Sequence, residues 1–244
     1  MWRKMTVIVA SMLMMLVAAC GGASLESTDK KNGSAIPASP EQSATVTTES
    51  YGGADNLYTI VIDPGHGGKD PGSTGASGMF EKNFTLRQSL ILAELLEQDP
   101  RFQVFMTRDD DVFLSTESHF RPNFANDMSA DLFISIHGNT YESSDAAGTE
   151  SYYYHKESLP FAEIMHKHVT EATGFTDRGV KKQNYFLIRE TTMPSVLLEL
   201  GYMTNPGNET EMWSDEFQER VAKAIVAGVN EYLNTWTHNT PEEL

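Results

Sequence analysis

Three short apolar runs, each followed by a glycine-containing turn, constrain the fold of this 244-residue chain more than any other feature. They cover residues 59–62, 132–136 and 195–200. Runs that are apolar on both faces and alternate with helical segments are typical of parallel strands covered by helices. We therefore expect a single α/β domain with a mainly parallel, twisted sheet flanked by helices on both faces.

The spacing of apolar residues predicts the other elements of this domain. Helices are expected over 83–98, 158–173 and 213–233. Strands are expected over 58–63, 102–107, 132–137, 150–155, 185–189 and 195–200. The folded domain should span residues 56–235, and the polar, acidic segment 236–244 is expected to be a disordered tail.

The first 55 residues are typical of an exported lipoprotein. Residues 1–19 combine a basic start with a short apolar run, as in a signal peptide. Small residues precede Cys20, the chain's only cysteine, and this pattern resembles a bacterial lipobox in which Cys20 is lipidated. Residues 20–55 are rich in small and polar residues, which predicts a flexible tether. We expect an envelope protein attached to a membrane through Cys20.

The chain has a formal net charge of -16. A nucleic-acid-binding protein needs a basic face to neutralise phosphates, so this balance argues against nucleic acid as a partner. The same acidity argues against electrostatic adhesion to anionic lipid.

Two histidines occupy equivalent places, His66 and His137, each directly after an apolar run and next to a glycine. The carboxyl ends of parallel strands meet at one sheet edge, where open α/β sheets bind ligands. Catalytic zinc usually has three protein ligands from His, Glu, Asp and Cys, plus a water. Glu81 follows a glycine-rich loop that could return it to His66; the other candidates for the third ligand are Asp63, Asp70 and Glu150.

Glu199 lies inside the third apolar run. A carboxylate there is costly unless it is paired or functional, and burial raises its pKa toward the range of a general base. An ion pair with Arg178 or Arg189 is the alternative explanation.

Together these segments resemble a known family, the zinc-dependent N-acetylmuramoyl-L-alanine amidases of the Amidase_3 type. The resemblance covers about residues 58–233. The motifs that carry it are Ile62–Gly68, Glu81–Asn83, Arg121–Asn126, Ala130–Asn139, Arg178–Lys181 with Asn184, and Met193–Asn205. It implies that His66, Glu81 and His137 bind one zinc ion at the carboxyl ends of the strands, and that Glu199 is the catalytic acid/base.

The resemblance also implies an activity: hydrolysis of the amide bond between N-acetylmuramic acid and L-alanine in peptidoglycan. Asn184 and Arg189 are candidates for substrate contacts, although an ion pair or a strand edge would explain them equally well. Residues 140–147 leave no room for the autoinhibitory helix that some relatives insert there, so we expect an open groove. We also expect a monomer. The alternatives are a zinc peptidase acting within the stem peptide and a non-catalytic envelope-binding module.

Overall fold

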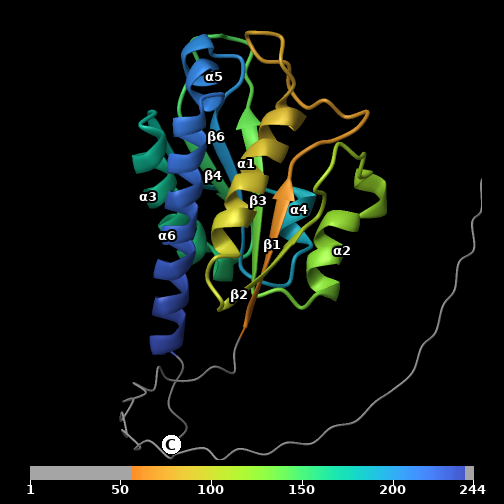
Figure 1. The fold of residues 1–244 in the computed structure, drawn as a ribbon, viewed down its shortest axis with the longest axis vertical. Helices are drawn as coiled ribbons and strands as arrows, with labels where there is room; N and C mark the ends of the chain where they lie inside the picture. The colour runs from red at the N-terminus through yellow and green to blue at the C-terminus, as the bar shows by residue number, and fades with distance from the viewer. Residues whose placement is uncertain (1–56, 240–244) are drawn as a thin grey trace, which may run out of the picture. The chain divides into compact units, whose positions relative to one another are not determined.

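The computed structural model describes residues 57–239, and their side chains as far as residue 235. A six-stranded sheet in the order β2-β1-β3-β6-β4-β5 forms its centre (Figure 1). The strands are β1 Tyr58–Pro64, β2 Phe102–Met106, β3 Leu132–Asn139, β4 Thr149–Tyr153, β5 Asp177–Lys182 and β6 Ser195–Tyr202. The helices are α1 Glu81–Leu96, α2 Phe120–Asp127, α3 Leu159–Thr173, α4 Phe186–Arg189, α5 Pro206–Met212 and α6 Asp215–Asn239, with 3-10 turns at Thr116–Ser118 and Lys156–Ser158.

The sheet is mainly parallel, as expected. Strands β2, β1, β3 and β6 run in one direction, and β4 pairs antiparallel with β6 and parallel with β5. Pro64 is in register with Ile136, and His137 with Glu199. The turns after β1 and β3 therefore lie at the same edge of the sheet, beside the end of β6.

Successive side chains of the central strands enter two different cores. In β1, Ile60 and Ile62 pack in the larger cluster, which also contains side chains of α1, α3 and α6. Val61 packs in the smaller cluster with side chains of α2 and α4. Because strand side chains alternate between faces, apolar residues at every position require helices on both sides of the sheet.

The predicted strand 185–189 is wrong, because residues 186–189 form the short helix α4. The remaining strand of the sheet is β5 at 177–182, which the sequence analysis did not predict. β5 is a sheet edge and is polar, with no buried residue. An edge strand needs no apolar face, so periodicity did not find it. The apolar residues Leu187 and Ile188 instead cover the smaller core from a helix.

The predicted helix 213–233 corresponds to α6, and the short helix α5 just before it was not predicted. The side chain of Asn205 accepts a hydrogen bond from the backbone N–H of Asn208 at the start of α5, and Pro206 follows it. The Ser214 hydroxyl accepts from the backbone N–H of Phe217 and begins α6. These are ordinary helix-start signals.

Helix α6 continues to Asn239, so the tail predicted from residue 236 begins within a helix. The signal peptide, Cys20 and the tether lie outside the described residues, as do residues 240–244. Within 57–239 no helix is long and apolar enough to cross a membrane.

Candidate metal centre

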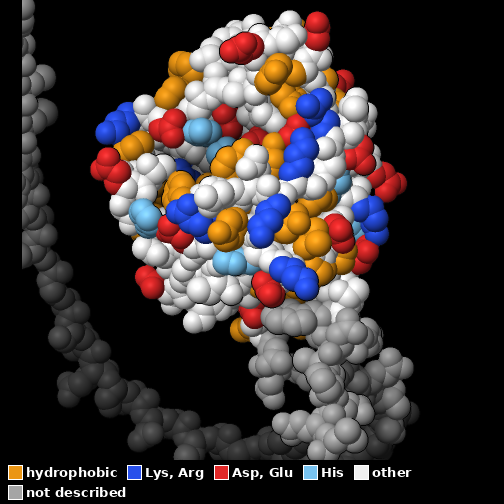
Figure 2. All heavy atoms as spheres, turned by 180° about the vertical axis from the view of Figure 1, so that it is seen from behind, with side chains coloured by type: hydrophobic (Ala, Val, Ile, Leu, Met, Phe, Trp, Pro, Cys, Tyr) orange, Lys and Arg blue, Asp and Glu red, His pale blue; other side chains and the backbone are white. Residues whose placement is uncertain are grey.

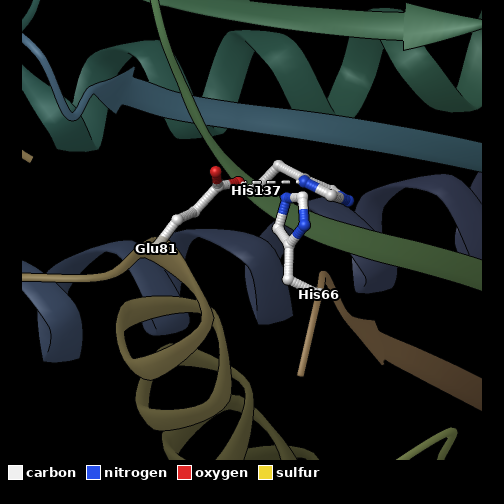
Figure 3. A group of neighbouring side chains, drawn as sticks. All are labelled: His66, Glu81 and His137. Atoms are coloured by element: carbon white, nitrogen blue, oxygen red, sulfur yellow. Dashed lines mark hydrogen bonds and ion pairs between the residues drawn. The ribbon is translucent and has the colours of Figure 1, made fainter. Parts of the chain in front are cut away.

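Three side chains from three separate elements point toward one another at the sheet edge (Figure 3). The Glu81 Oε1 atom lies 3.1 Å from His66 Nε2 and 3.0 Å from His137 Nδ1. One possible ligand atom from each residue lies within 4.8 Å of the others. The structure thus brings together the two histidines and the one acid that the resemblance implied.

His66 is held in an unusual backbone conformation, with φ of 61°. A residue other than glycine adopts this left-handed region only where the surroundings stabilise it, and such residues cluster at functional sites. Arg121 donates to the His66 carbonyl oxygen at 2.6 Å. On the ring, Nδ1 lies 3.0 Å from Asp70 Oδ2, which turns Nε2 toward Glu81. Asp70 therefore orients His66 in the way that carboxylates orient metal-binding histidines.

Glu81 is the first residue of α1 and is buried. Its Oε2 atom accepts the backbone N–H of Ser73 at 2.8 Å, and Oε1 accepts that of Gly138 at 3.1 Å. Burial alone would raise the pKa of this carboxyl, but hydrogen bonds and charge from His137 and His66 hold it well below its usual range. Glu81 is therefore an ionised carboxylate.

His137 belongs to β3, and its ring lies directly over Gly65 in the turn after β1. A Cβ atom at position 65 would lie 2.3 Å from the ring. The side-chain ring is only 13% exposed, and its Nε2 atom is shielded from solvent without a hydrogen-bond partner. The glycine is thus needed to let two chain segments approach closely enough for both histidines to face Glu81.

The donor set fits a catalytic metal ion. Two neutral imidazoles and one carboxylate form a common catalytic set for zinc, with a fourth position left for water or substrate. Ligands about 2.0–2.1 Å from a tetrahedral zinc lie about 3.3 Å from one another. The two separations between Glu81 Oε1 and the histidine nitrogens, 3.0 and 3.1 Å, are close to that value.

Glu199 lies beside this cluster, in register with His137 on the neighbouring strand. Its Oε2 atom is shielded from solvent and has no hydrogen-bond partner. Burial, with the negative charges of Glu81 and Glu150, raises the pKa of this carboxyl well above its usual range. A carboxylate of this kind is a stronger base than that of an ordinary glutamate, which suits a group that takes a proton from water.

The two arginines weighed as partners of Glu199 are both engaged elsewhere. Arg178 binds Glu150, as do Lys181 and the hydroxyls of two tyrosines. Arg189 binds Glu190 at 2.7 Å. The ion-pair explanation of Glu199 is therefore wrong, and Glu150 is a buried structural carboxylate rather than a metal ligand.

Asp63, another alternative third ligand, is wholly buried. It accepts hydrogen bonds from Thr107 and Arg121 at 2.6 Å and from Ser135 at 2.7 Å. Despite burial, Arg121 and the two hydroxyls hold the pKa of this carboxyl below its ordinary value. Asp63 therefore supports the turn that carries His66.

A groove of about 1040 Å³ contains the three clustered residues and Glu199. The predicted substrate contacts line the same groove: Asn184 lies just before α4 and Arg189 is the last residue of that helix. The hydrogen bond between them, from Arg189 Nη1 to Asn184 Oδ1, is 3.0 Å long. Residues 140–148, between β3 and β4, form no helix that would cover this groove.

Two supporting residues escaped the sequence reasoning. In the sequence Arg121 stands out only as part of a motif, yet in the structure it joins Asp63 to the backbone of His66. Glu209 in α5 accepts two hydrogen bonds from Ser77, at 2.8 Å and 2.6 Å, and so holds the loop before Glu81. Ser77 and Glu209 are 132 positions apart, so no local pattern could have linked them.

A family profile, Amidase_3, described as N-acetylmuramoyl-L-alanine amidase, matches residues 60–231. This chain belongs to that family. The match covers all six strands apart from the first residues of β1.

Solved structures of amidases share this fold. The catalytic domain of CwlV, an amidase from Bacillus (Paenibacillus) polymyxa var. colistinus, is 45% identical with a TM-score of 0.71, over 73% of this chain and 99% of that one. An amidase from Clostridium difficile 630 is 34% identical with a TM-score of 0.71, over 74% of this chain and 98% of that one. CwlD from Clostridioides difficile, 28% identical with a TM-score of 0.68, was solved in complex with the GerS lipoprotein.

A curated relative, the probable cell wall amidase LytH of Staphylococcus epidermidis, is 35% identical over 179 residues. The alignment covers 72% of this chain and 59% of LytH. The chain therefore spans less than two thirds of the length of this relative.

Proposed function

We propose that this protein is a zinc-dependent N-acetylmuramoyl-L-alanine amidase that hydrolyses peptidoglycan between N-acetylmuramic acid and the L-alanine of the stem peptide. The observation that carries the proposal is the cluster of His66, Glu81 and His137 beside Glu199, in one groove on an amidase fold. The two histidines and Glu81 would hold the ion. Glu199 is free of ion pairs with the described residues and would act on the attacking water.

Zinc bound here would supply a Lewis acid that acidifies water and polarises the scissile carbonyl. Glu199 takes a proton from the water whose oxygen attacks the carbonyl carbon. When the carbon–nitrogen bond breaks, the same carboxyl gives that proton to the departing L-alanine amine. The raised pKa of Glu199 makes its carboxylate a stronger base for the first half of this transfer, removal of the proton from water. Asp70 keeps the His66 ring turned toward the centre throughout.

The test is digestion of purified peptidoglycan, with released fragments identified by mass spectrometry. We expect free stem peptides that begin with L-alanine, lost on chelation and restored by zinc. Glu199→Gln should bind zinc as the wild type does and lose at least about 100-fold in activity. Cleavage inside the stem peptide would show a peptidase instead, and no release by zinc-loaded protein would contradict the enzyme assignment.

We also propose that Cys20 carries a lipid and that residues 20–55 tether the catalytic domain to a membrane in the cell envelope. The support is the sequence pattern alone: an apolar run, small residues and the single cysteine. Fractionation of cells that produce the wild type or Cys20→Ala tests this. The wild type should sediment with membranes and the variant should not, and equal sedimentation would contradict lipidation at Cys20.

A further inference from the structure

The groove has an uneven distribution of charge. Asp70, Glu81 and Glu199 bring three carboxylates to it. Among its lining residues, all in the described part of the chain, Arg189 has the only Lys or Arg side chain. Ligand sites have a few polar groups that fix the orientation of the ligand, and a single cation among carboxyl groups is suited to that role.

Arg189 is fixed in place before any ligand binds. Its Nη1 donates to Asn184 Oδ1 at 3.0 Å and its Nη2 donates to Glu190 Oε1 at 2.7 Å. Glu190 in turn pairs with His119, so the chain of contacts reaches α2. A guanidinium that is already oriented loses little conformational entropy when it binds a ligand.

Donors remain on this pair of side chains. A guanidinium has five N–H groups, and the two contacts above use two of them. The Asn184 oxygen faces Arg189, so its NH₂ group is turned away from the guanidinium. The Arg189 side chain is 37% exposed, which leaves its planar fork accessible from the groove. Side-by-side donors of this kind match the two oxygens of a carboxylate.

The two halves of the proposed substrate differ in charge. The N-acetylated glycan is neutral once the lactyl carboxyl of muramic acid is part of the scissile amide. The stem peptide carries free carboxylates beyond the L-alanine. A cation at one place in the groove therefore distinguishes the peptide half from the glycan half.

We propose that Arg189, with Asn184, binds a stem-peptide carboxylate and so places the peptide half of the substrate at the α4 end of the groove. This inference rests on the proposed function and deepens it, because it assigns specificity for an acidic stem peptide. The edge strand β5 precedes this end in the chain and carries Arg178, Lys181 and Lys182. Figure 2 shows a band of Lys and Arg side chains on one face of the molecule, in a chain with a net charge of -16.

The experiment uses two muramyl-peptide substrates that differ only in the residue after L-alanine, which has either a free carboxylate or a carboxamide. Zinc-loaded wild type, Arg189→Met, Arg189→Lys and the control Arg87→Met are assayed for kcat and KM on both. Arg87 is on α1, where it pairs with Asp215 away from the groove.

We expect the wild type to prefer the carboxylate by about 10- to 100-fold in kcat/KM, mainly through KM, since the contacted carboxylate takes no part in the reaction. Arg189→Met should lose this preference, and Arg189→Lys should keep part of it because lysine is a point charge without the planar fork. Arg87→Met should keep the wild-type preference. The ratio between substrates is independent of the fraction of folded enzyme, so a merely structural role for Arg189 would lower both rates and leave the ratio unchanged.

A preference retained by Arg189→Met would overturn the inference, as would equal cleavage of both substrates by the wild type. In either case the amidase assignment would stand. If the wild type released neither peptide, the proposed function would fail, and this inference would fail with it.

Discussion

Arg121→Met should be among the most damaging single changes outside the metal cluster. The Arg121 side chain is 7% exposed and donates to Asp63, which is 0% exposed, at 2.6 Å. It also donates to the carbonyl oxygens of Pro64 at 2.7 Å and His66 at 2.6 Å. Methionine fills much of the same space but supplies no donor. The variant would leave a buried carboxylate without its cation and would release the strained His66 backbone.

The magnitude follows from what stays behind. Removing one partner of a buried ion pair typically costs about 3–5 kcal/mol. Asp63 would keep two hydroxyl donors, Thr107 and Ser135. Arg108 would still hold the turn after β1, because it donates to the Gly65 carbonyl oxygen at 2.7 Å. We therefore expect the low end, a loss of about 3 kcal/mol in the free energy of unfolding.

Urea unfolding followed by circular dichroism, with zinc chelated in every sample, measures this loss without the contribution of bound metal. Arg87→Met is the matched control: its ion pair with Asp215 is exposed, so it should cost about 0–1 kcal/mol. Asp63→Asn combined with Arg121→Met should cost less than the sum of the single changes, because the two side chains share one interaction. A loss below about 1 kcal/mol for Arg121→Met, or simple additivity, would refute the reasoning.

Three further predictions concern the surroundings of the site. Gly72→Ala places a methyl group 2.6 Å from the ring of His66, at a residue whose φ is +66°. Zinc affinity, measured by competition with a chelating dye, should therefore fall. An unchanged affinity would show that the loop can move aside. Glu209→Gln replaces the carboxylate that accepts two hydrogen bonds from Ser77. It should weaken zinc binding by about 10-fold, with little loss in thermal stability. Wild-type affinity for zinc would show that the loop before α1 holds its place without Glu209. The pKa of Glu150 is lowered from 4.5 to about 2, since tyrosine and basic side chains outweigh the effect of burial. Because the folded-state pKa is lowered, the contribution of Glu150 to stability is complete above about pH 4.5 and is lost as the pH falls toward 2. The melting temperature of the wild type should therefore fall more steeply in this window than that of Glu150→Gln. Parallel curves would contradict this.

Sequence reasoning located the central sheet and the ends of its strands well. Strands β1, β3 and β6 each contain a short apolar run, and such runs are local signals that need no knowledge of the fold. It failed at β5 and α4, where the signal is reversed: the strand is polar because it is an edge, and the helix is apolar because it covers a core. It also missed α5, although Asn205 and Pro206 mark the start of that helix.

The sequence by itself determined which residue types could do chemistry: two histidines after buried strands and a carboxylate within a third. Only the tertiary structure decided how they combine. Register between strands brings His137 beside Glu199, and hydrogen bonds across 56 positions bring Glu81 to His137. The same packing commits Arg178 to Glu150 and leaves Glu199 unpaired. The physical reason is that apolar periodicity is a property of neighbouring residues, whereas the partner of a buried charge is whichever group the folded chain brings within hydrogen-bonding distance.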